Sequence, residues 1–212
     1  MRSENETFIE AARRAQLADC AIEVIAEGGI GKASMARIAE RAGVSVGVIS
    51  YHFGNKAGLI AAVVEQVAKT AVELMKPRIV AQPTATLGLR TLITSNLEFM
   101  RDHPNALRAL LEIIRADDGV YAEQGAQAIT DVQGVLHWGQ QTGEFGSFDT
   151  RVMAIAIRAA IDAVPMMLGP DEDLIAYGEE LAALFERATR KTEPIPETEP
   201  IRKTEPIRKE GV

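Results

Sequence analysis

The segment from residue 38 to residue 56, IAERAGVSVGVISYHFGNK, constrains the fold of this chain more than any other stretch. Apolar side chains at its start recur at the i, i+3, i+4, i+7 spacing of one buried helical face: Met35, Ile38, Ala39 and Ala42. Gly43 follows them, and a glycine at this place supplies the left-handed conformation that ends many helices. The pattern predicts a short helix followed by a tight turn.

A second short helix is expected directly after the turn, with Ser45 as its first cap. Its buried side is predicted to be apolar and consists of Val44, Val48 and Ile49. Its outward side consists of Val46, Gly47, Ser50, Tyr51 and His52. Two short helices joined in this way form a helix-turn-helix, and the second of them is the helix that enters a major groove.

These residues resemble the TetR-type transcriptional repressors. The matching pattern is Ile38-Ala39-x-x-Ala42-Gly43-Val44-Ser45-x-Gly47-x-x-x-Tyr51-x-Phe53-x-x-Lys56, after an amphipathic helix that ends at residues 22–29 and before Leu59-Ile60. Within that family, Val-Gly-Val-Ile-Ser-Tyr-His-Phe is most similar to the choline-sensing betaine-operon repressors. The resemblance covers about the first sixty residues, and the remainder agrees only in its helical layout.

The resemblance implies an all-α fold, in which an amino-terminal three-helix helix-turn-helix domain is joined by a shared helix to a larger helical ligand-binding and dimerisation domain. It also implies three partners: double-stranded, palindromic operator DNA, a second copy of the chain in a homodimer, and a small-molecule effector. The residues that match the family's DNA contacts are Ser34, Ser45, Val46, Gly47, Ser50, Tyr51, His52 and Lys56.

Elementary chemistry gives these residues roles. Gly47 lets the backbone approach a phosphate or a base edge, and Val46 offers only apolar contact, for example with a thymine methyl. Tyr51 and His52 can donate hydrogen bonds, while Lys56 stands at a helix start, where free N–H groups favour an anion. The structural alternative is that Tyr51 and His52 pack on the domain and that Lys56 is merely solvated.

The charge distribution is compatible with DNA binding but does not demand it. Residues 1–56 hold seven Lys/Arg and seven Asp/Glu, whereas residues 57–190 hold eleven against eighteen and carry the whole net charge of −7. A weak electrostatic footprint implies modest non-specific affinity, so more of the binding would rest on dimer geometry and local contacts.

The capping residues and helix breakers in the rest of the sequence predict a series of helices. A capping box of Thr7 and Glu10 opens the first helix, which runs to about residue 27. Asn55 caps a helix from Lys56 to about residue 76, which ends at a linker-like break over residues 77–83. Further helices are expected at about 86–102, 104–116, 121–142, 150–168 and 172–190. The domains are therefore predicted as 1–56 for DNA binding, 57–190 for ligand binding and dimerisation, and 191–212 as a tail.

The tail is a hexad repeat, TEPIPE followed twice by TEPIRK. A proline in every hexad forbids a helix, and one isoleucine per hexad buries too little surface to offset the cost of ordering, so a disordered extension is expected. The alternative is a docking segment in the polyproline II conformation.

The last two helices carry apolar stripes that need partners, which a second copy supplies in an isologous four-helix bundle. The expected dimer contacts are Ile161, Val164, Leu168, Leu181, Leu184 and Phe185. The expected ligand-binding residues lie between 86 and 142 and are Phe99, Met100, Arg115, His137 and Trp138.

Enzymes are disfavoured, and no catalytic residue, metal ligand set or cofactor is predicted. The three histidines, at positions 52, 103 and 137, lack a carboxylate or cysteine at metal-ligand spacing. The first ten residues contain no apolar secretion segment, and the run from Val152 to Leu168 is interrupted by charges, so a cytoplasmic protein without membrane contact is expected. The interpretation is a ligand-responsive repressor; the alternative is a helical ligand-binding or scaffolding protein that no longer binds an operator.

Overall fold

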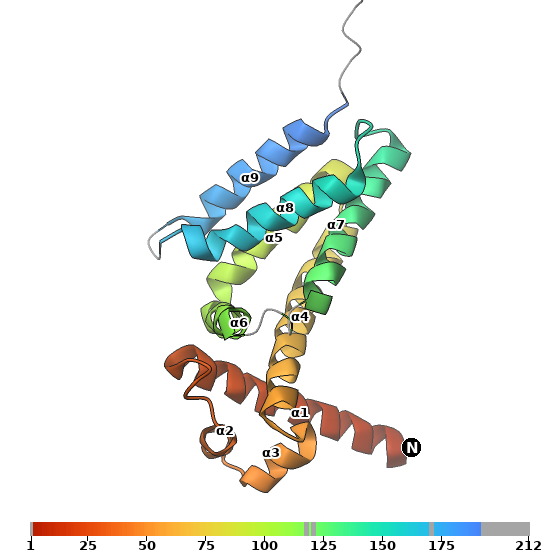
Figure 1. The fold of residues 1–212 in the computed structure, drawn as a ribbon. Helices are drawn as coiled ribbons and strands as arrows, with labels where there is room; N and C mark the ends of the chain where they lie inside the picture. The colour runs from red at the N-terminus through yellow and green to blue at the C-terminus, as the bar shows by residue number, and fades with distance from the viewer. Residues whose placement is uncertain (1, 117–118, 120–121, 170–171, 192–212) are drawn as a thin grey trace, which may run out of the picture.

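The structure is a computed structural model that describes residues 2–116, 119, 122–169 and 172–191, with side chains from residue 8 onward. Helices account for most of this part of the chain, so the all-α prediction is confirmed (Figure 1). In chain order the helices are α1 (Arg2–Gly28), α2 (Met35–Ala42), α3 (Val46–Phe53), α4 (Lys56–Val80), α5 (Ala85–Asp102), α6 (Pro104–Ala116), α7 (Ala122–Thr142), α8 (Thr150–Met167) and α9 (Leu174–Thr189). The hexad repeat lies outside the described residues.

Two predicted helix boundaries are wrong. α1 begins at Arg2, ahead of the expected capping box at Thr7, because the residues before Thr7 continue the helix. α4 does not stop before Pro77 but runs to Val80. The proline removes one backbone donor within the last turns, and the Ala81 N–H still bonds the Pro77 carbonyl oxygen at 3.1 Å, so one more turn is retained.

The first hydrophobic core lies between α1, α2, α3 and the first half of α4. Its fully buried side chains include Leu17, Ile25, Ile38, Ile49 and Leu59. Two residues of α6, Ala109 and Ile113, belong to the same core, and both are fully buried. The amino-terminal core therefore continues past residue 56 and includes a helix from the second half of the chain.

The second core lies between α5, α7, α8 and α9. Leu89, Ile93, Leu136 and Ile157 are among its fully buried side chains. α5 packs against both α8 and α9, and α7 packs against α8. α4 connects the two cores, since its first half lies in the amino-terminal core and it also packs against α5 (Figure 1).

None of the helices in the described ranges has both the length and the hydropathy that crossing a bilayer requires.

At the end of α7 the Phe145 ring packs directly against the backbone of Gly139, where a side chain would not fit. The Phe145 ring packs so closely on Gly139 that an added Cβ there would lie 2.1 Å from the nearest ring atom. The Phe145 N–H bonds the Gly139 carbonyl oxygen at 2.9 Å, and Phe145 also forms an isolated antiparallel bridge with Arg190. The turn after α7 is thus joined both to α7 and to the end of α9.

Glu144, in the same turn, caps the start of α5. Its carboxylate accepts hydrogen bonds from the backbone N–H groups of Ala85 and Thr86, each at 3.0 Å, and from the hydroxyls of Thr86 and Thr142. Partial burial by itself would raise the pKa of Glu144, but these donors outweigh it and hold the pKa below its ordinary value. An anion at a helix amino terminus is also favoured by the helix dipole.

Glu144→Gln is expected to lower the free energy of unfolding at pH 7 by about 1 kcal/mol, because hydrogen bonds to a charged acceptor are replaced by weaker ones. Since the folded-state pKa is depressed, the stabilisation is present above the ordinary carboxyl pKa of 4.5 and is lost as the pH falls through the folded value. Denaturant unfolding at pH 7 and pH 3 measures both effects, with Glu65→Gln on exposed α4 surface as control. An equal difference at both pH values would contradict the role of the charge.

Candidate nucleic-acid interface

The turn between α2 and α3 forms as the sequence predicts. Ser34 caps α2 by accepting a hydrogen bond from the Arg37 N–H at 3.2 Å. Gly43 has a φ of 65°, in the left-handed region, which lets the Val44 N–H reach the Ala39 carbonyl oxygen at 2.9 Å. This turn directs α3 away from α2 and fixes which of its faces is exposed.

Ser45 occupies the N-cap position of α3, but the prediction that its hydroxyl caps the helix is wrong. The hydroxyl makes no capping hydrogen bond, and the Val48 N–H bonds the Ser45 carbonyl oxygen at 3.0 Å. The hydroxyl instead lies over Gly47, where an added Cβ would be 3.6 Å from it. Ser45 is exposed at the start of α3.

α3 is anchored by one face and exposed on the other. Ile49 and Phe53 are buried in the amino-terminal core. The exposed face carries a row of residues predicted to lie outward, with His52 half-buried at its end: Val46, Gly47, Ser50, Tyr51 and His52. Tyr51 is the most prominent of them, since 73% of its surface is exposed.

α1 holds the carboxyl end of α3 through two side chains. The Tyr51 hydroxyl donates to Glu10 Oε1 at 3.2 Å, and this hydrogen bond to a carboxylate raises the pKa of Tyr51. Arg14 donates from Nη1 to the His52 carbonyl oxygen and lies over the Phe53 ring, 4.7 Å from its centroid. The end of α3 is therefore positioned from outside the helix-turn-helix itself.

Lys56 opens α4 beside this surface. Its Nζ donates to the Ile30 carbonyl oxygen in the loop between α1 and α2 at 2.8 Å. Asn55 caps the same helix by accepting a hydrogen bond from the Gly58 N–H at 2.9 Å, as predicted. Since an ammonium has three donors, Lys56 retains two that can meet an anion next to the free N–H groups of the first turn.

The five residues expected to line a ligand cavity lie in different surroundings. Met100 is buried in the second core, and Trp138 packs on Gly88 of α5. Arg115 is exposed and pairs with Glu112, and His137 is exposed with its Nε2 2.9 Å from the Thr150 hydroxyl. Phe99 alone of the five lines the cleft described next.

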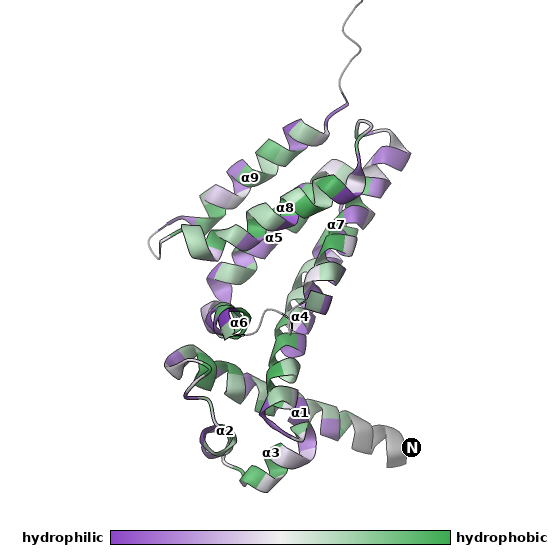
Figure 2. Cartoon of the chain, viewed as in Figure 1, coloured by the Kyte–Doolittle hydropathy of each residue, from purple (hydrophilic) through white to green (hydrophobic). Residues whose placement is uncertain are grey.

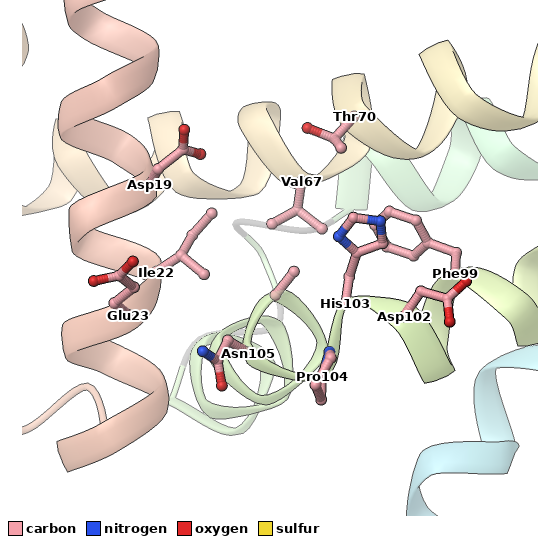
Figure 3. Close-up of a pocket in the computed structure, with 11 residues that line it drawn as sticks. Asp19, Ile22, Glu23, Val67, Thr70, Phe99, Asp102, His103, Pro104 and Asn105 are labelled. Carbon is pink, nitrogen blue, oxygen red and sulfur yellow. The ribbon is translucent and has the colours of Figure 1, made fainter.

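This cleft, of about 300 Å³, lies between α1, α4 and the corner where α5 meets α6 (Figure 3). Its wall includes the carboxylates of Asp19, Glu23 and Asp102 and an aromatic pair, Phe99 and His103, whose rings stack with centroids 4.6 Å apart. Burial raises the pKa of Asp19, an effect that exceeds the opposing hydrogen bond from Gln66. The apolar residues of its wall, Ile22, Val67, Phe99 and Ala106, belong to the first core or pack against it.

The residues expected at a dimer contact divide between the inside and the surface of the chain. Ile161, Val164, Leu181 and Phe185 are buried within the second core. Leu168 is half-buried, and Leu184 is 51% exposed. The inward faces of α8 and α9 are thus already covered by the chain's own helices.

Residues 17–63 match the family described as "Bacterial regulatory proteins, tetR family". The matched segment contains the whole α2–turn–α3 unit together with part of α1 and the start of α4. Residues 17–63 therefore carry the amino-terminal segment of a TetR-family regulator.

Sequence relatives extend the likeness to about half of the chain. The HTH-type transcriptional regulator BetI of Escherichia coli (strain UTI89 / UPEC) is 34% identical over 105 residues, which are 49% of this chain and 54% of the relative. The BetI regulator of Cronobacter sakazakii (strain ATCC BAA-894) is 33% identical over 102 residues, 47% of this chain and 50% of the relative. The chain thus aligns with about half the length of these curated relatives.

Solved structures extend the likeness to most of the chain. The transcriptional regulator FadR from Bacillus subtilis, in complex with stearoyl-CoA, has a TM-score of 0.73 and 25% identity, covering 80% of this chain and 95% of that one. The fatty acid degradation regulator FadR from Bacillus halodurans has a TM-score of 0.75 and 22% identity, covering 81% and 93%. At 22% identity, the likeness to the Bacillus halodurans protein shows a shared fold and no more.

The contacts of the two α1 residues that hold α3 were not predicted from the sequence. From the sequence, Glu10 is expected only in a capping box, and Arg14 contributes only a charge. Their spacing of four residues places them on one face of α1, which is the available signal. The pattern does not say which helix that face meets.

Proposed function

We propose that this chain is a homodimeric transcriptional regulator of the TetR family, a repressor that binds a palindromic operator and is released by a small-molecule effector. The observation that carries the proposal is the exposed face of α3, anchored by Ile49 and Phe53 and placed within the segment that matches the family. The relatives named as transcriptional regulators support it.

In this proposal α3 enters the major groove and each exposed side chain has a role. The hydroxyls of Ser45, Ser50 and Tyr51 donate to phosphates or base edges, as does the His52 ring. Val46, 43% exposed, contacts a thymine methyl, and Gly47 allows the backbone to come close. Ser34 at the start of α2 and Lys56 at the start of α4 bind the flanking phosphates.

Lys56→Ala and Tyr51→Phe should each weaken operator binding by on the order of 1 kcal/mol or more per subunit, because each removes a donor to the DNA backbone. Lys56→Ala should also reduce the slope of log affinity against log salt by about 0.9 for each phosphate that the variant no longer neutralises. Fluorescence anisotropy with a palindromic duplex selected from a random pool measures both quantities.

The control for this experiment is Lys76→Ala, which removes an exposed lysine far along α4 from the α3 surface and should leave binding unchanged. Wild-type protein that binds a palindrome no better than random DNA would contradict the repressor proposal. That outcome would favour the alternative, a helical ligand-binding or scaffolding protein without an operator.

We further propose that the outward faces of α8 and α9 form the homodimer contact. They expose large apolar side chains that the chain itself does not cover: Val152, Ile155, Met166, Met167, Tyr177 and Leu184. Figure 2 shows that hydrophobic residues run along much of α8. Exposed large apolar side chains gathered on two helices are typical of an interaction site, and a two-fold axis lets the same surface serve both copies.

Leu184→Glu should convert the dimer to a monomer that no longer shifts operator DNA, because a buried unpaired carboxylate is costly and one chain reaches only one half-site. Sedimentation velocity at micromolar concentration measures the change. The matched control is Leu74→Glu on α4, since Leu74 is 49% exposed and Leu184 is 51% exposed. A monomeric wild-type protein, or equal dissociation by both variants, would contradict the proposed contact.

For the effector, we propose the cleft between α1, α4 and the α5–α6 corner as the binding site. Its position supports this, because a molecule there touches α1 of the DNA-binding unit and α6, whose Ala109 and Ile113 lie in the same core. The FadR structure with stearoyl-CoA supports a ligand-responsive function in general terms.

An effector that lowers operator affinity a hundredfold must prefer the non-binding conformation by about 2.7 kcal/mol, and operator DNA must weaken effector binding by the same factor. Calorimetry of a compound found by thermal-shift screening, with free and operator-bound dimer, measures the coupling. Ala106→Phe should fill the cleft and remove the response, whereas Ala122→Phe at the exposed start of α7 should not. Equal effector affinity in both forms would exclude coupling.

A further inference from the structure

The contact between Tyr51 and Glu10 joins a strongly exposed residue of α3 to a carboxylate of another helix. The Tyr51 hydroxyl donates to Glu10 Oε1 at 3.2 Å, and 73% of the Tyr51 surface is exposed. The hydrogen bond therefore lies at the edge of the surface that the proposed function assigns to DNA, and the following inference rests on that function.

A tyrosine hydroxyl has one proton and donates to one acceptor at a time. If Tyr51 donates to a DNA phosphate, its hydrogen bond with Glu10 has to break. The carboxylate of Glu10 would then lie beside a phosphate without its donor, and two negative charges within a Debye length of about 8–10 Å repel each other. Both effects oppose the approach of DNA.

Among the described side chains, Arg13 and Arg14 direct their hydrogen bonds to acceptors other than Glu10. Arg14, one helical turn along α1, is engaged with the His52 carbonyl oxygen and the Phe53 ring. Arg13 donates to Gln16 at 2.8 Å. His52 meets Tyr51 edge-on, with ring centroids 5.1 Å apart, and its position is fixed by the Arg14 contact with its backbone. Of the described side chains around it, the Tyr51 hydroxyl is the one that donates to Glu10.

We propose that Glu10 is an autoinhibitory residue for DNA binding, which occupies the Tyr51 hydroxyl in the free protein and has to release it when a phosphate arrives. Arg14 and Glu10 then have opposite effects, although they contact the same end of α3. Arg14 fixes the helix end in place, whereas Glu10 withholds a donor from the DNA. Operator affinity is consequently lower than the exposed face of α3 alone would give.

The test is a double-mutant cycle on an operator duplex selected by the wild-type protein from a random pool. Glu10→Ala should tighten binding about three- to fivefold, the range expected for exposed charged contacts. In the Tyr51→Phe background the same change should tighten binding less, because the hydroxyl that Glu10 occupies is absent and only the charge repulsion is relieved. Glu65→Ala, which removes an exposed carboxylate from α4, is the control for net charge and should leave affinity nearly unchanged.

A second measurement tests the contact without DNA. The pKa of Tyr51, followed by NMR with ring-labelled tyrosine, should fall toward its ordinary value in Glu10→Ala, since the hydrogen bond to Glu10 raises it in the wild type. An unchanged pKa would show that the contact is absent in solution and would overturn the inference.

Two further outcomes on DNA would also overturn it. Weaker binding by Glu10→Ala would show that Glu10 positions Tyr51 for DNA, and equal tightening in both backgrounds would show that only the charge of the carboxylate matters. Either result leaves the proposed function intact. If the wild-type protein selects no operator, the proposed function fails. The cycle is then run on a random duplex at low salt, where Glu10→Ala should tighten binding more when the Tyr51 hydroxyl is present than in Tyr51→Phe.

Discussion

The burial of α6 in the amino-terminal core is the contact on which the organisation of this chain depends. Ala109 and Ile113 lie fully buried among side chains of α1 and α4, so the core of the helix-turn-helix unit is completed by a helix from beyond the matched segment. Since close-packed interiors transmit displacement, a movement of the α5–α6 corner has to be accommodated by α1. α4 provides a second connection, because it begins at Lys56 and packs against α5 further along. The two halves of the molecule are therefore joined through packed side chains in two places.

Local chemistry explains why much of the fold could be predicted from the sequence. Gly43 ends α2 and Asn55 opens α4 because a left-handed glycine and a capping amide act within a few residues of the chain. Helix ends fixed by weaker signals are harder to predict. Pro77 is expected to stop α4, yet a proline costs only one backbone hydrogen bond close to the end of a helix, and α4 continues for three residues beyond it.

Site residues could be predicted where they lie on one helix, but not where their contacts depend on helices distant in the sequence. The outward residues of α3 follow from helical periodicity, and the structure exposes Val46, Ser50 and Tyr51. The ligand and dimer residues depend on how distant helices meet, which periodicity does not contain. Ile161 and Phe185 satisfy the pattern of an apolar stripe, but that stripe faces the chain's own core, and the exposed apolar face lies on the other side of α8 and α9. The contacts of Glu10 and Arg14 with α3 likewise depend on the crossing of two helices.

The bridge between Phe145 and Arg190 determines where the last described residues emerge. The Gly146 N–H bonds the Thr189 carbonyl oxygen at 2.9 Å, so the end of α9 is fastened to the turn after α7. This turn lies at the opposite end of the molecule from α3 (Figure 1). A fluorophore or surface-attachment tag placed after residue 191 is consequently tethered at the face remote from α3. The protein can therefore be immobilised or labelled from that side with its α3 surface left open to solution.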